Sequence, residues 1–445
     1  MRRIVAVTAA VLATSTVIAA PALATDASVI TVSDRAMHQE MDGFGIATAF
    51  DRVELLRGLS PQQQNEIFGL WFDRNSGAGV SILRLGIGSS PLGSPFDKMI
   101  SIEPNDPGGP DAPPQYIWDG DDNGQVWAAK VAQSYGVQRF YADAWSAPAY
   151  MKTNGDENNG GMVKPEWEAA YARYLAQYTK FYAQEGIRIT DLGFTNEPDF
   201  TAPYASMRYT PQQAAEFIKV LGPLARGVKL ACCDSFGWDQ AKAYTAAINA
   251  DPQAQRFVET FTGHGYASPV TSPQPTNSPT WMSEWNPNGS TWNENWDDGS
   301  GYDGFAIAQN IHNALTLGNV TGYVYWVGDS IGATRALIQI DPANTTYHVS
   351  KRLWALAAYS RFIRPGAVRL DTSATDPALQ VSALRNEDGS TVMEVLNTGT
   401  TAVTWNRVDG QATAYLTDGT HSLSPSPVTG NTVTLQPRAL TTIVF

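Results

Sequence analysis

Two glutamates in this sequence have the residue type and the local setting that acid–base chemistry needs. The first is Glu197, in the segment DLGFTNEPDF (191–200), where a short apolar run ends in Asn196, Glu197 and Pro198. Because proline cannot continue a central strand, we expect the strand to end here and the carboxylate to meet solvent and substrate. Taken alone, the tripeptide is equally typical of a turn that caps a following helix.

The second glutamate, Glu284, has the same local pattern. In the segment PTWMSEWNP (279–287), an apolar run with Trp281 and Met282 reaches Glu284, and Pro287 follows. Two carboxylates that face one cleft can cleave a glycosidic bond, because one protonates the leaving oxygen and the other attacks the sugar or activates water. We therefore predict that Glu197 is the catalytic acid and Glu284 the nucleophile.

Strand-like apolar runs that alternate with amphipathic segments must position these residues. We expect strands over residues 43–47, 80–85, 137–145, 189–195, 228–233, 261–266, 281–284 and 322–327. Helical spacing of apolar residues occurs over residues 60–72, 165–185, 210–225 and 239–249. Eight strand–helix repeats predict an α/β fold, a (β/α)₈ TIM barrel, whose active site lies at the C-terminal ends of its strands.

A second unit should follow the barrel, because a barrel uses about 250 residues and this chain has 445. From residue 365 the pattern changes to short alternating strands, such as 379–384 and 391–396. We predict a catalytic barrel over residues 41–364 and an antiparallel β-sandwich over 365–445, which a strand in residues 28–40 joins. The long segments 88–121, 147–167, 268–280 and 285–302 should form the cleft walls.

The N-terminus has the pattern of a secretory signal peptide. Arg2 and Arg3 precede an apolar run over residues 4–20 and the small-residue pattern Ala-Leu-Ala at 22–24. We predict a signal peptide over residues 1–24 and a secreted, extracellular protein. A membrane anchor is the alternative, but the apolar run is short and ends in a cleavage pattern.

Composition and charge argue against several classes of binding partner and cofactor. The net charge of −13 argues against nucleic acid and anionic membranes. Cys232 and Cys233 are adjacent and are the chain's two cysteines, so no disulfide framework can hold the fold. We interpret them as small buried strand residues, with a vicinal disulfide as the alternative. No His/Cys spacing predicts a metal site, and the segment 86–88 lacks the rest of a dinucleotide pattern, so we expect no cofactor.

Several longer segments, in order, resemble glycoside hydrolase family 30, and most of all its subfamily 7, known best from fungal xylanases. They are SILRLGIGSSP (81–91), YADAWSAPAYMKTNG (141–155), GFTNEP (193–198), YASMR (204–208), WMSEW (281–285) and KRLWAL (351–356). The resemblance implies a barrel paired with a sandwich made from both chain ends. It also implies double displacement with retention of anomeric configuration, with Glu197 as acid/base and Glu284 as nucleophile.

In this setting, neighbouring strand-end residues are expected to support the two glutamates. Arg84 is placed to steady Glu284, with a structural ion pair as the alternative. Asn196 would bond the sugar's 2-hydroxyl or the nucleophile. His264 and Tyr266 could bond Glu284 or Glu197, although a lone strand-end histidine is often merely hydrogen-bonded.

Aromatic and charged residues at the same rim are candidates for substrate binding. Trp145 and Trp326 are candidates for the platform under the sugar, and packing at the barrel mouth is the alternative. The segment GFGIATAFDR (43–52) places Arg52 where related xylanases have an arginine that recognises a glucuronate branch. Here Asp51 replaces a glutamine and could pair with Arg52 instead.

The resemblance favours plant cell-wall β-1,4-xylan as substrate, with or without glucuronate branches, and we expect a monomer. The loop 154–167 is shorter than in the fungal relatives and lacks their cysteines, so endo or exo action stays open. A β-1,6-glycanase acting on galactan or glucan is one alternative, and a non-catalytic carbohydrate-binding protein is another.

Overall fold

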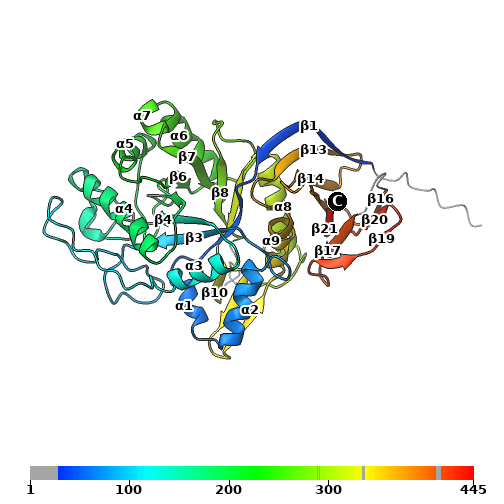
Figure 1. The fold of residues 1–445 in the computed structure, drawn as a ribbon, viewed down its shortest axis with the longest axis horizontal. Helices are drawn as coiled ribbons and strands as arrows, with labels where there is room; N and C mark the ends of the chain where they lie inside the picture. The colour runs from blue at the N-terminus through cyan, green and yellow to red at the C-terminus, as the bar shows by residue number, and fades with distance from the viewer. Residues whose placement is uncertain (1–28, 288, 290, 333–335, 407–411) are drawn as a thin grey trace, which may run out of the picture.

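The computed structural model describes residues 29–287, 289, 291–332, 336–406 and 412–445. The predicted signal peptide, residues 1–24, lies outside the described residues. Figure 1 shows the barrel and its surrounding helices on the left and the β-sandwich on the right. The predicted fold class, a (β/α)₈ barrel with a side β-sandwich, is confirmed.

Eight parallel strands close the barrel in sequence order. They are β2 (Gly43–Ala47), β3 (Ile82–Ile87), β4 (Arg139–Ala144), β5 (Asp191–Leu192), β6 (Lys229–Ser235), β7 (Val258–His264), β8 (Thr280–Trp285) and β9 (Gly322–Tyr325). Each predicted strand overlaps an observed one. The largest difference is at β5, where regular pairing covers two residues and the rest of the predicted segment, to residue 195, continues as irregular backbone.

Helices surround the strands. They are α1 (Arg52–Leu56), α2 (Pro61–Phe72), α3 (Gln125–Ser134), α4 (Glu168–Gln184), α5 (Pro211–Leu221), α6 (Trp238–Asn249), α7 (Pro252–Gln255), α8 (Gly304–Thr316) and α9 (Lys351–Phe362), with 3₁₀ turns at Ala149–Met151 and Pro165–Trp167. Local sequence fixes some of their starts. Ser60 and Thr210 each form a capping box with the glutamine three residues later, and a proline follows each cap.

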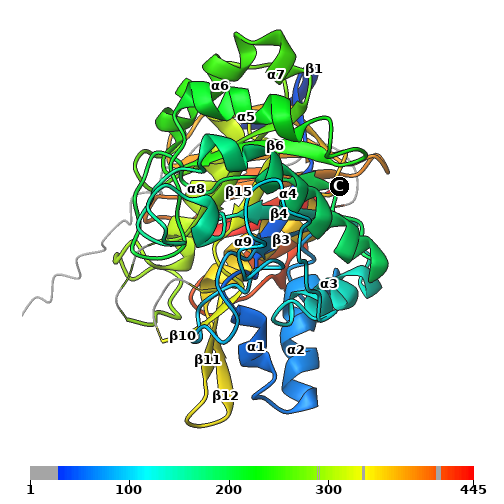
Figure 2. The same ribbon diagram turned by 90° about the vertical axis from the view of Figure 1, so that its left-hand side faces the viewer.

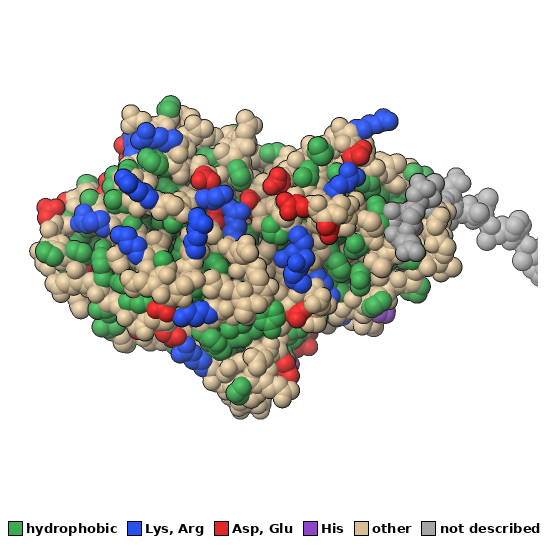
Figure 3. Space-filling view, viewed as in Figure 1, with side chains coloured by type: hydrophobic (Ala, Val, Ile, Leu, Met, Phe, Trp, Pro, Cys, Tyr) green, Lys and Arg blue, Asp and Glu red, His purple; other side chains and the backbone are tan. Residues whose placement is uncertain are grey.

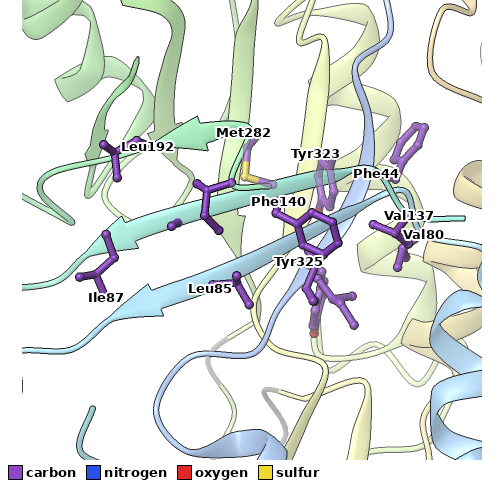
Figure 4. Close-up of a cluster of buried hydrophobic side chains, with 14 of the residues drawn as sticks. Phe44, Val80, Leu85, Ile87, Val137, Phe140, Leu192, Met282, Tyr323 and Tyr325 are labelled. Atoms are coloured by element: carbon purple, nitrogen blue, oxygen red, sulfur yellow. The ribbon is translucent and has the colours of Figure 1, made fainter. Parts of the chain in front are cut away.

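Along each strand, side chains point alternately into and out of the barrel. The inward-pointing side chains of the strands form layers. Outward-facing residues such as Leu85 and Ile87 join the hydrophobic core of which Figure 4 shows part. An inner apolar layer consists of Ile82, Tyr141, Ala231, Trp281 and Val324. Two positions further along three of these strands come the buried polar residues Arg84, Asp143 and Ser283. The strands therefore carry a polar layer above the apolar one, towards the C-terminal end of the barrel.

The C-terminal unit is made of two antiparallel sheets. The larger has the order β1 (Ile30–Glu40), β13 (Val368–Ala374), β14 (Leu379–Arg385), β15 (Thr391–Asn397), β21 (Ala439–Val444), β17 (Thr413–Thr417) and β18 (Ser424–Ser426). The smaller contains β16 (Val403–Asn406), β20 (Thr432–Leu435) and β19 (Val428–Thr429). As predicted, the N-terminal strand joins this unit, because β1 pairs with β13.

The barrel and the sandwich share one hydrophobic core. Leu384, Val392, Leu396 and Leu440 of the sandwich belong to the same cluster as the buried face of α9. Burying a leucine side chain stabilises a fold by roughly 1.5–3 kcal/mol. The sandwich therefore packs against the barrel through this shared core and is not joined to it by the chain connection alone.

A third small sheet was not expected from the sequence. It consists of β10 (Asp329–Ile331), β11 (Ile338–Asp341) and β12 (Thr346–Val349), and it projects below the barrel in Figure 2. Cys232 and Cys233 are buried in β6, as expected, and are joined by the vicinal disulfide that was the alternative.

The surface seen in Figure 3 carries acidic and basic side chains interspersed over both units. Among the described residues, no helix has the length and the apolar character needed to cross a bilayer.

Candidate active site

Strand ends bring Glu197 and Glu284 together at one mouth of the barrel. Glu284 lies within β8 and pairs with His264 of β7. Glu197 follows β5, and its φ angle of 50° turns the chain out of the strand direction just before Pro198. One carboxylate oxygen of Glu197 lies within 4.8 Å of one of Glu284. Both glutamates are almost completely buried.

The Glu284 carboxylate accepts hydrogen bonds from two side chains. Arg84 Nη1 donates a hydrogen bond to Oε2, and the Tyr266 hydroxyl donates to Oε1 at 2.9 Å. Asn286 Nδ2 in turn donates to the Tyr266 hydroxyl oxygen at 2.9 Å. A carboxylate oriented in this way has a fixed position, which suits a nucleophile.

Glu197 has a different set of partners. His264 Nδ1 lies 3.1 Å from Oε1, and the Tyr204 hydroxyl donates to Oε2 at 3.1 Å. Burial raises the pKa of Glu197, and the nearby Glu284 charge adds to the rise against the opposing effect of His264. Burial alone would lower the pKa of His264, but the carboxylates of Glu284, Asp234 and Glu197 outweigh it and raise that pKa. A carboxyl group with a raised pKa can serve as a proton donor near neutral pH.

Arg84 connects Glu284 to a buried polar cluster beneath it. It is completely buried, and besides Glu284 its Nη2 donates to Asn196 at 2.7 Å, Asp143 at 2.8 Å and Asp234 at 3.1 Å. Arg84 thus contacts Glu284, as expected, and it also forms the structural ion pairs that were the alternative. Asn196 reaches Glu284 through Arg84, since its amide oxygen accepts from the guanidinium.

Asp234 is the centre of this cluster. Its Oδ2 accepts from the Tyr141 hydroxyl, its Oδ1 accepts from the Ser283 hydroxyl, and His264 Nε2 lies 3.8 Å away. Burial would raise the pKa of Asp234, but Arg84 and His264 outweigh it and lower that pKa. Burial, followed by the Asp234 charge, raises the pKa of neighbouring Asp143 well above its usual value. The surroundings therefore shift the pKa values of Asp234 and Asp143 in opposite directions.

A pocket of about 350 Å³ opens above the two glutamates. Its lining is largely aromatic and is made of Phe50, Arg52, Asp97, Trp145, Glu197, Phe200, Pro203, Tyr204, Phe236, Tyr266, Glu284, Asn286 and Trp326. Aromatic faces pack on the apolar faces of sugar rings. Of the four long segments expected to form the walls, 88–121 and 285–302 contribute to this lining. Among the described residues, 147–167 and 268–280 contribute none.

The two predicted platform tryptophans differ in exposure. Trp145 is buried and packs over the Arg84 guanidinium, with 4.5 Å between the guanidinium carbon and the ring centre. Trp326 is only partly buried, and its ring centre lies 5.6 Å from that of Trp145. Trp145 is therefore packed at the barrel mouth, which was the alternative, whereas Trp326 presents more of its ring to the pocket.

Arg52 also reaches the pocket, but its partner is not the one considered from the sequence. Its Nη2 forms an ion pair with Asp97 Oδ1 at 2.6 Å, and Asp51 forms none with it. Asp97 lies in the long segment after β3, far from Arg52 in the sequence. The sequence around Arg52, which shows only its neighbour Asp51, therefore could not predict this ion pair.

Glu197, His264 and Glu284 offer three ligand atoms close enough to surround a cation. Glu197 and Glu284 already accept hydrogen bonds from Tyr204, Tyr266 and Arg84, and His264 Nδ1 lies 3.1 Å from Glu197 Oε1. The positive charge of Arg84 beside Glu284 also opposes a cation there. We assign no metal to this cluster.

Comparison with known families decides what this barrel is. Residues 41–281 match the model of the glycosyl hydrolase family 30 TIM-barrel domain, and residues 366–443 match that of the family 30 beta sandwich domain. The chain belongs to glycosyl hydrolase family 30. It is therefore a glycoside hydrolase, and the resemblance to family 30 inferred from its motifs is confirmed.

Relatives within family 30 cover most of the chain. The catalytic domain of the family 30 xylanase C from Talaromyces cellulolyticus is 36% identical, with a TM-score of 0.86 over 93% of this chain and 99% of that one. Glucuronoxylanase XynC of Bacillus subtilis is 28% identical over 70% of this chain and 71% of its own length. Endo-1,6-beta-D-glucanase neg1 of Aspergillus fumigatus is 25% identical over 81% and 79% respectively.

Some residues of this family 30 site were not predicted from the sequence. Tyr204 contacts Glu197 from seven positions further along the chain, and Asp143 and Asp234 lie beneath the glutamates. The signal for the aspartates was present, because each is an acidic residue at the end of an apolar strand, like the two glutamates. Only knowledge of the strand register shows that their side chains point inward.

Proposed function

We propose that this family 30 glycoside hydrolase cleaves β-1,4-linked xylan with retention of configuration. In this proposal Glu284 is the nucleophile and Glu197 is the acid/base. The main support is the short separation of the two carboxylates, within 4.8 Å between nearest ligand atoms. Retaining enzymes hold the pair about 5–5.5 Å apart, whereas inverting enzymes need about 6.5–9.5 Å to fit a water molecule.

The surroundings of each glutamate suit its role in two steps. In the first, Glu284 attacks the anomeric carbon, the glycosidic C–O bond breaks, and Glu197 gives its proton to the leaving oxygen. In the second, Glu197 takes a proton from water, and the hydroxide displaces Glu284 from the sugar. Because esterification removes the Glu284 charge, the pKa of Glu197 falls between the steps, which converts the acid into a base.

Xylan as the substrate is supported by the relatives rather than by the geometry. The 36% identical structure is a xylanase, and a second relative is named a glucuronoxylanase. The relative named as an endo-1,6-glucanase matches 81% of the chain, against 70% for the glucuronoxylanase, so β-1,6-glucan is the alternative to test.

A polysaccharide panel tests the substrate, and product stereochemistry tests the mechanism. We expect reducing sugar to be released from xylan and none from β-1,6-glucan or β-1,6-galactan. Proton NMR of the first products should show the β-anomer before mutarotation. Initial release of the α-anomer would contradict retention, and turnover of the β-1,6-polymers without turnover of xylan would contradict the substrate.

We also propose that the protein is exported and acts on plant cell-wall polysaccharide outside the cell. The arginines, apolar run and Ala-Leu-Ala pattern in residues 1–24 support this proposal. The mature protein in the medium should begin at Thr25. A cell-associated protein that retains Arg2 and Arg3 would contradict it.

A further inference from the structure

A stacked pair of phenylalanines lines the pocket beside Glu197. The rings of Phe200 and Phe236 are nearly parallel, with 4.2 Å between their centres and 12° between their planes. Both side chains are partly buried, and both belong to the pocket lining. The Phe236 ring also lies 5.5 Å from the ring of Tyr266, whose hydroxyl donates to Glu284. The two phenylalanines therefore present one apolar surface to the pocket, next to both glutamates.

Backbone hydrogen bonds hold this phenylalanine pair in place. The N–H of Phe200 donates to the carbonyl oxygen of Glu197 at 2.9 Å. The N–H of Phe236 donates to Asp199 Oδ1 at 2.9 Å, and its carbonyl oxygen accepts from the N–H of Tyr266 at 3.1 Å. A surface that is ordered before a ligand arrives loses little conformational entropy on binding, so this arrangement suits a binding role.

The strand order of the barrel places the pair on one side of the line between the two glutamates. Glu197 follows β5 and Glu284 lies in β8, so β6 and β7 separate them on one side of the rim. Phe236 directly follows β6, and Phe200 lies three positions after Glu197. The pair therefore belongs to the β5–β6 side of the barrel mouth.

Three other aromatic residues of the lining come from the opposite side. Phe50, Trp145 and Trp326 follow β2, β4 and β9 respectively. The centre of the Phe50 ring lies 5.3 Å from that of Trp145 and 5.8 Å from that of Trp326. A sugar chain that is cleaved between the glutamates therefore has an aromatic wall on each side of the cleaved bond.

We propose that Phe200 and Phe236 bind the sugar on the leaving-group side of the cleaved bond. The proposal rests on the function proposed above, in which Glu197 protonates the leaving oxygen. Because the Phe200 backbone is bonded to that of Glu197, the pair lies on the side from which the leaving group departs. The phenyl rings pack against an apolar face of the sugar ring.

The charges of the lining indicate a neutral sugar at this place. Among the described residues, the charged members of the lining are the two glutamates, Arg52 and Asp97. Arg52 begins α1 and Asp97 lies in the segment after β3, so neither comes from the strands that carry the phenylalanine pair. The expected occupant is therefore an unbranched, uncharged pyranose unit of the polymer.

This contact should lower the barrier to cleavage, because binding energy from a sugar beyond the cleaved bond positions that bond between the glutamates. A substrate with a sugar leaving group makes the contact, whereas a substrate with a fluoride leaving group does not. The two kinds of substrate should therefore respond differently to loss of the rings.

Two substrates that transfer the same xylobiosyl group test this role. We would measure kcat/KM for the cleavage of xylotetraose into two xylobiose units and kcat/KM for β-xylobiosyl fluoride, and take their ratio. Phe200→Leu and Phe236→Leu keep the apolar volume and remove the flat ring. Each should lower the ratio about five- to tenfold, as expected for one lost ring contact. Phe200→Tyr keeps the ring and should keep the ratio.

The second step of the reaction gives an independent measurement. After fluoride has left, added xylobiose that binds the phenylalanine pair can replace water as the acceptor. Glu197 then takes the proton of an acceptor hydroxyl, and its oxygen displaces Glu284 from the anomeric carbon to give xylotetraose. Phe200→Leu and Phe236→Leu should lower the ratio of transfer to hydrolysis. Each ratio is measured within one preparation, so it does not depend on the fraction of folded enzyme.

Phe181→Leu is the matched control. Phe181 of α4 is a partly buried phenylalanine that stacks on Trp118, with 5.0 Å between the ring centres and 5° between the planes, and it does not line the pocket. This variant should leave both ratios within about twofold of wild type, the scatter expected for an independent site.

Ratios within that same range in Phe200→Leu and Phe236→Leu would overturn the proposal. So would an equal fall of both ratios in Phe181→Leu, because it would show a general effect of losing a ring. If the wild-type enzyme cleaves neither xylotetraose nor xylobiosyl fluoride, the xylan function proposed above fails and the role of the pair fails with it. That outcome is distinguishable because it needs no variant.

Discussion

The backbone N–H of Glu197 donates a hydrogen bond to the carbonyl oxygen of Asp234 at 2.8 Å, and both residues have positive φ angles, 50° and 52°. Left-handed backbone at a non-glycine residue costs about 1–3 kcal/mol and persists where surrounding contacts fix it. Here the contact links the ends of two neighbouring barrel strands. Asp234 thus holds Glu197 through its backbone and Arg84 through its side chain.

We expect Asp234→Asn to lower kcat at least tenfold with little change in KM, because Asp234 positions Arg84 and lies 3.8 Å from His264 Nε2 without lining the pocket. Asp143→Asn is the matched comparison. Since burial and the Asp234 charge raise the pKa of Asp143 and disfavour its charged form, an amide should replace it with less than a threefold change. Steady-state kinetics of both variants check this, and equal losses would contradict the assignment of charge within the pair.

Variants of Glu197 and Glu284, the two glutamates proposed to be catalytic, should differ in their response to leaving-group chemistry. We expect Glu197→Gln and Glu284→Gln each to lower turnover of xylan about a thousandfold. With an aryl xyloside whose phenolate leaves without protonation, Glu197→Gln should still form the glycosyl-enzyme in a burst. Glu284→Gln should show no burst. A burst in the Glu284 variant, or unchanged xylan turnover in either, would refute the assigned roles.

The partner of Glu197 should set the alkaline limit of activity. Burial raises the pKa of Glu197, and the hydrogen bond and charge of His264 partly oppose that rise. His264→Gln removes the charge, so the pKa of Glu197 should rise further. Because the acid must be protonated, the alkaline limb of kcat/KM should move to higher pH. Tyr204→Phe should shift it in the same direction by less, and a shift to lower pH would contradict this account.

A buried carboxyl group in the sandwich should make stability depend on pH. Glu394 of β15 is buried, its Oε2 accepts from the Thr442 hydroxyl at 2.8 Å, and burial raises its pKa well above the usual value. The folded state therefore binds a proton that the unfolded state releases above a pH of about 4.3. Stability should fall as the pH rises from there towards the folded-state pKa.

The substitution Glu394→Gln removes this proton uptake. We expect it to raise the melting temperature at pH 7–8 and to have little effect at pH 4. Thermal unfolding across this range provides the measurement. A difference in melting temperature that stays constant with pH would show that Glu394 does not titrate as described.

Removal of the sandwich should disable the barrel. A chain that ends at residue 364 exposes the side of the shared core that Leu384, Val392, Leu396 and Leu440 cover. We expect this truncated chain to be insoluble, or to melt far below the full chain and to lose activity. A soluble, fully active product would refute structural support as the role of the sandwich.

The barrel was predictable because its strands are buried on both faces and end in recognisable residues. Continuous apolar runs such as those around Leu85 and Leu230 stand out in the sequence, and Pro198 and Pro287 mark where two of them stop. Capping pairs such as Ser60 with Gln63 fixed helix starts locally. The same local signals placed Glu197 and Glu284 at strand ends.

The rest of the site depends on contacts that no local pattern encodes. Asp97 meets Arg52 because a long loop folds back over α1, and Tyr204 meets Glu197 because the chain after β5 turns back on itself. The β10–β12 sheet has three or four residues in each strand, too few for alternation to be distinguished from a loop.

The pairing of β1 with β13 joins a segment that is synthesised early with one that is synthesised much later. Thr31 and Ser373, whose hydroxyls lie 2.6 Å apart, are separated by 342 positions. β1 leaves the ribosome long before β13, so its backbone hydrogen-bonding groups stay unpaired until most of the polypeptide has emerged. A nascent chain stalled within the barrel would carry that open edge, and it is there that self-association of incomplete molecules should begin.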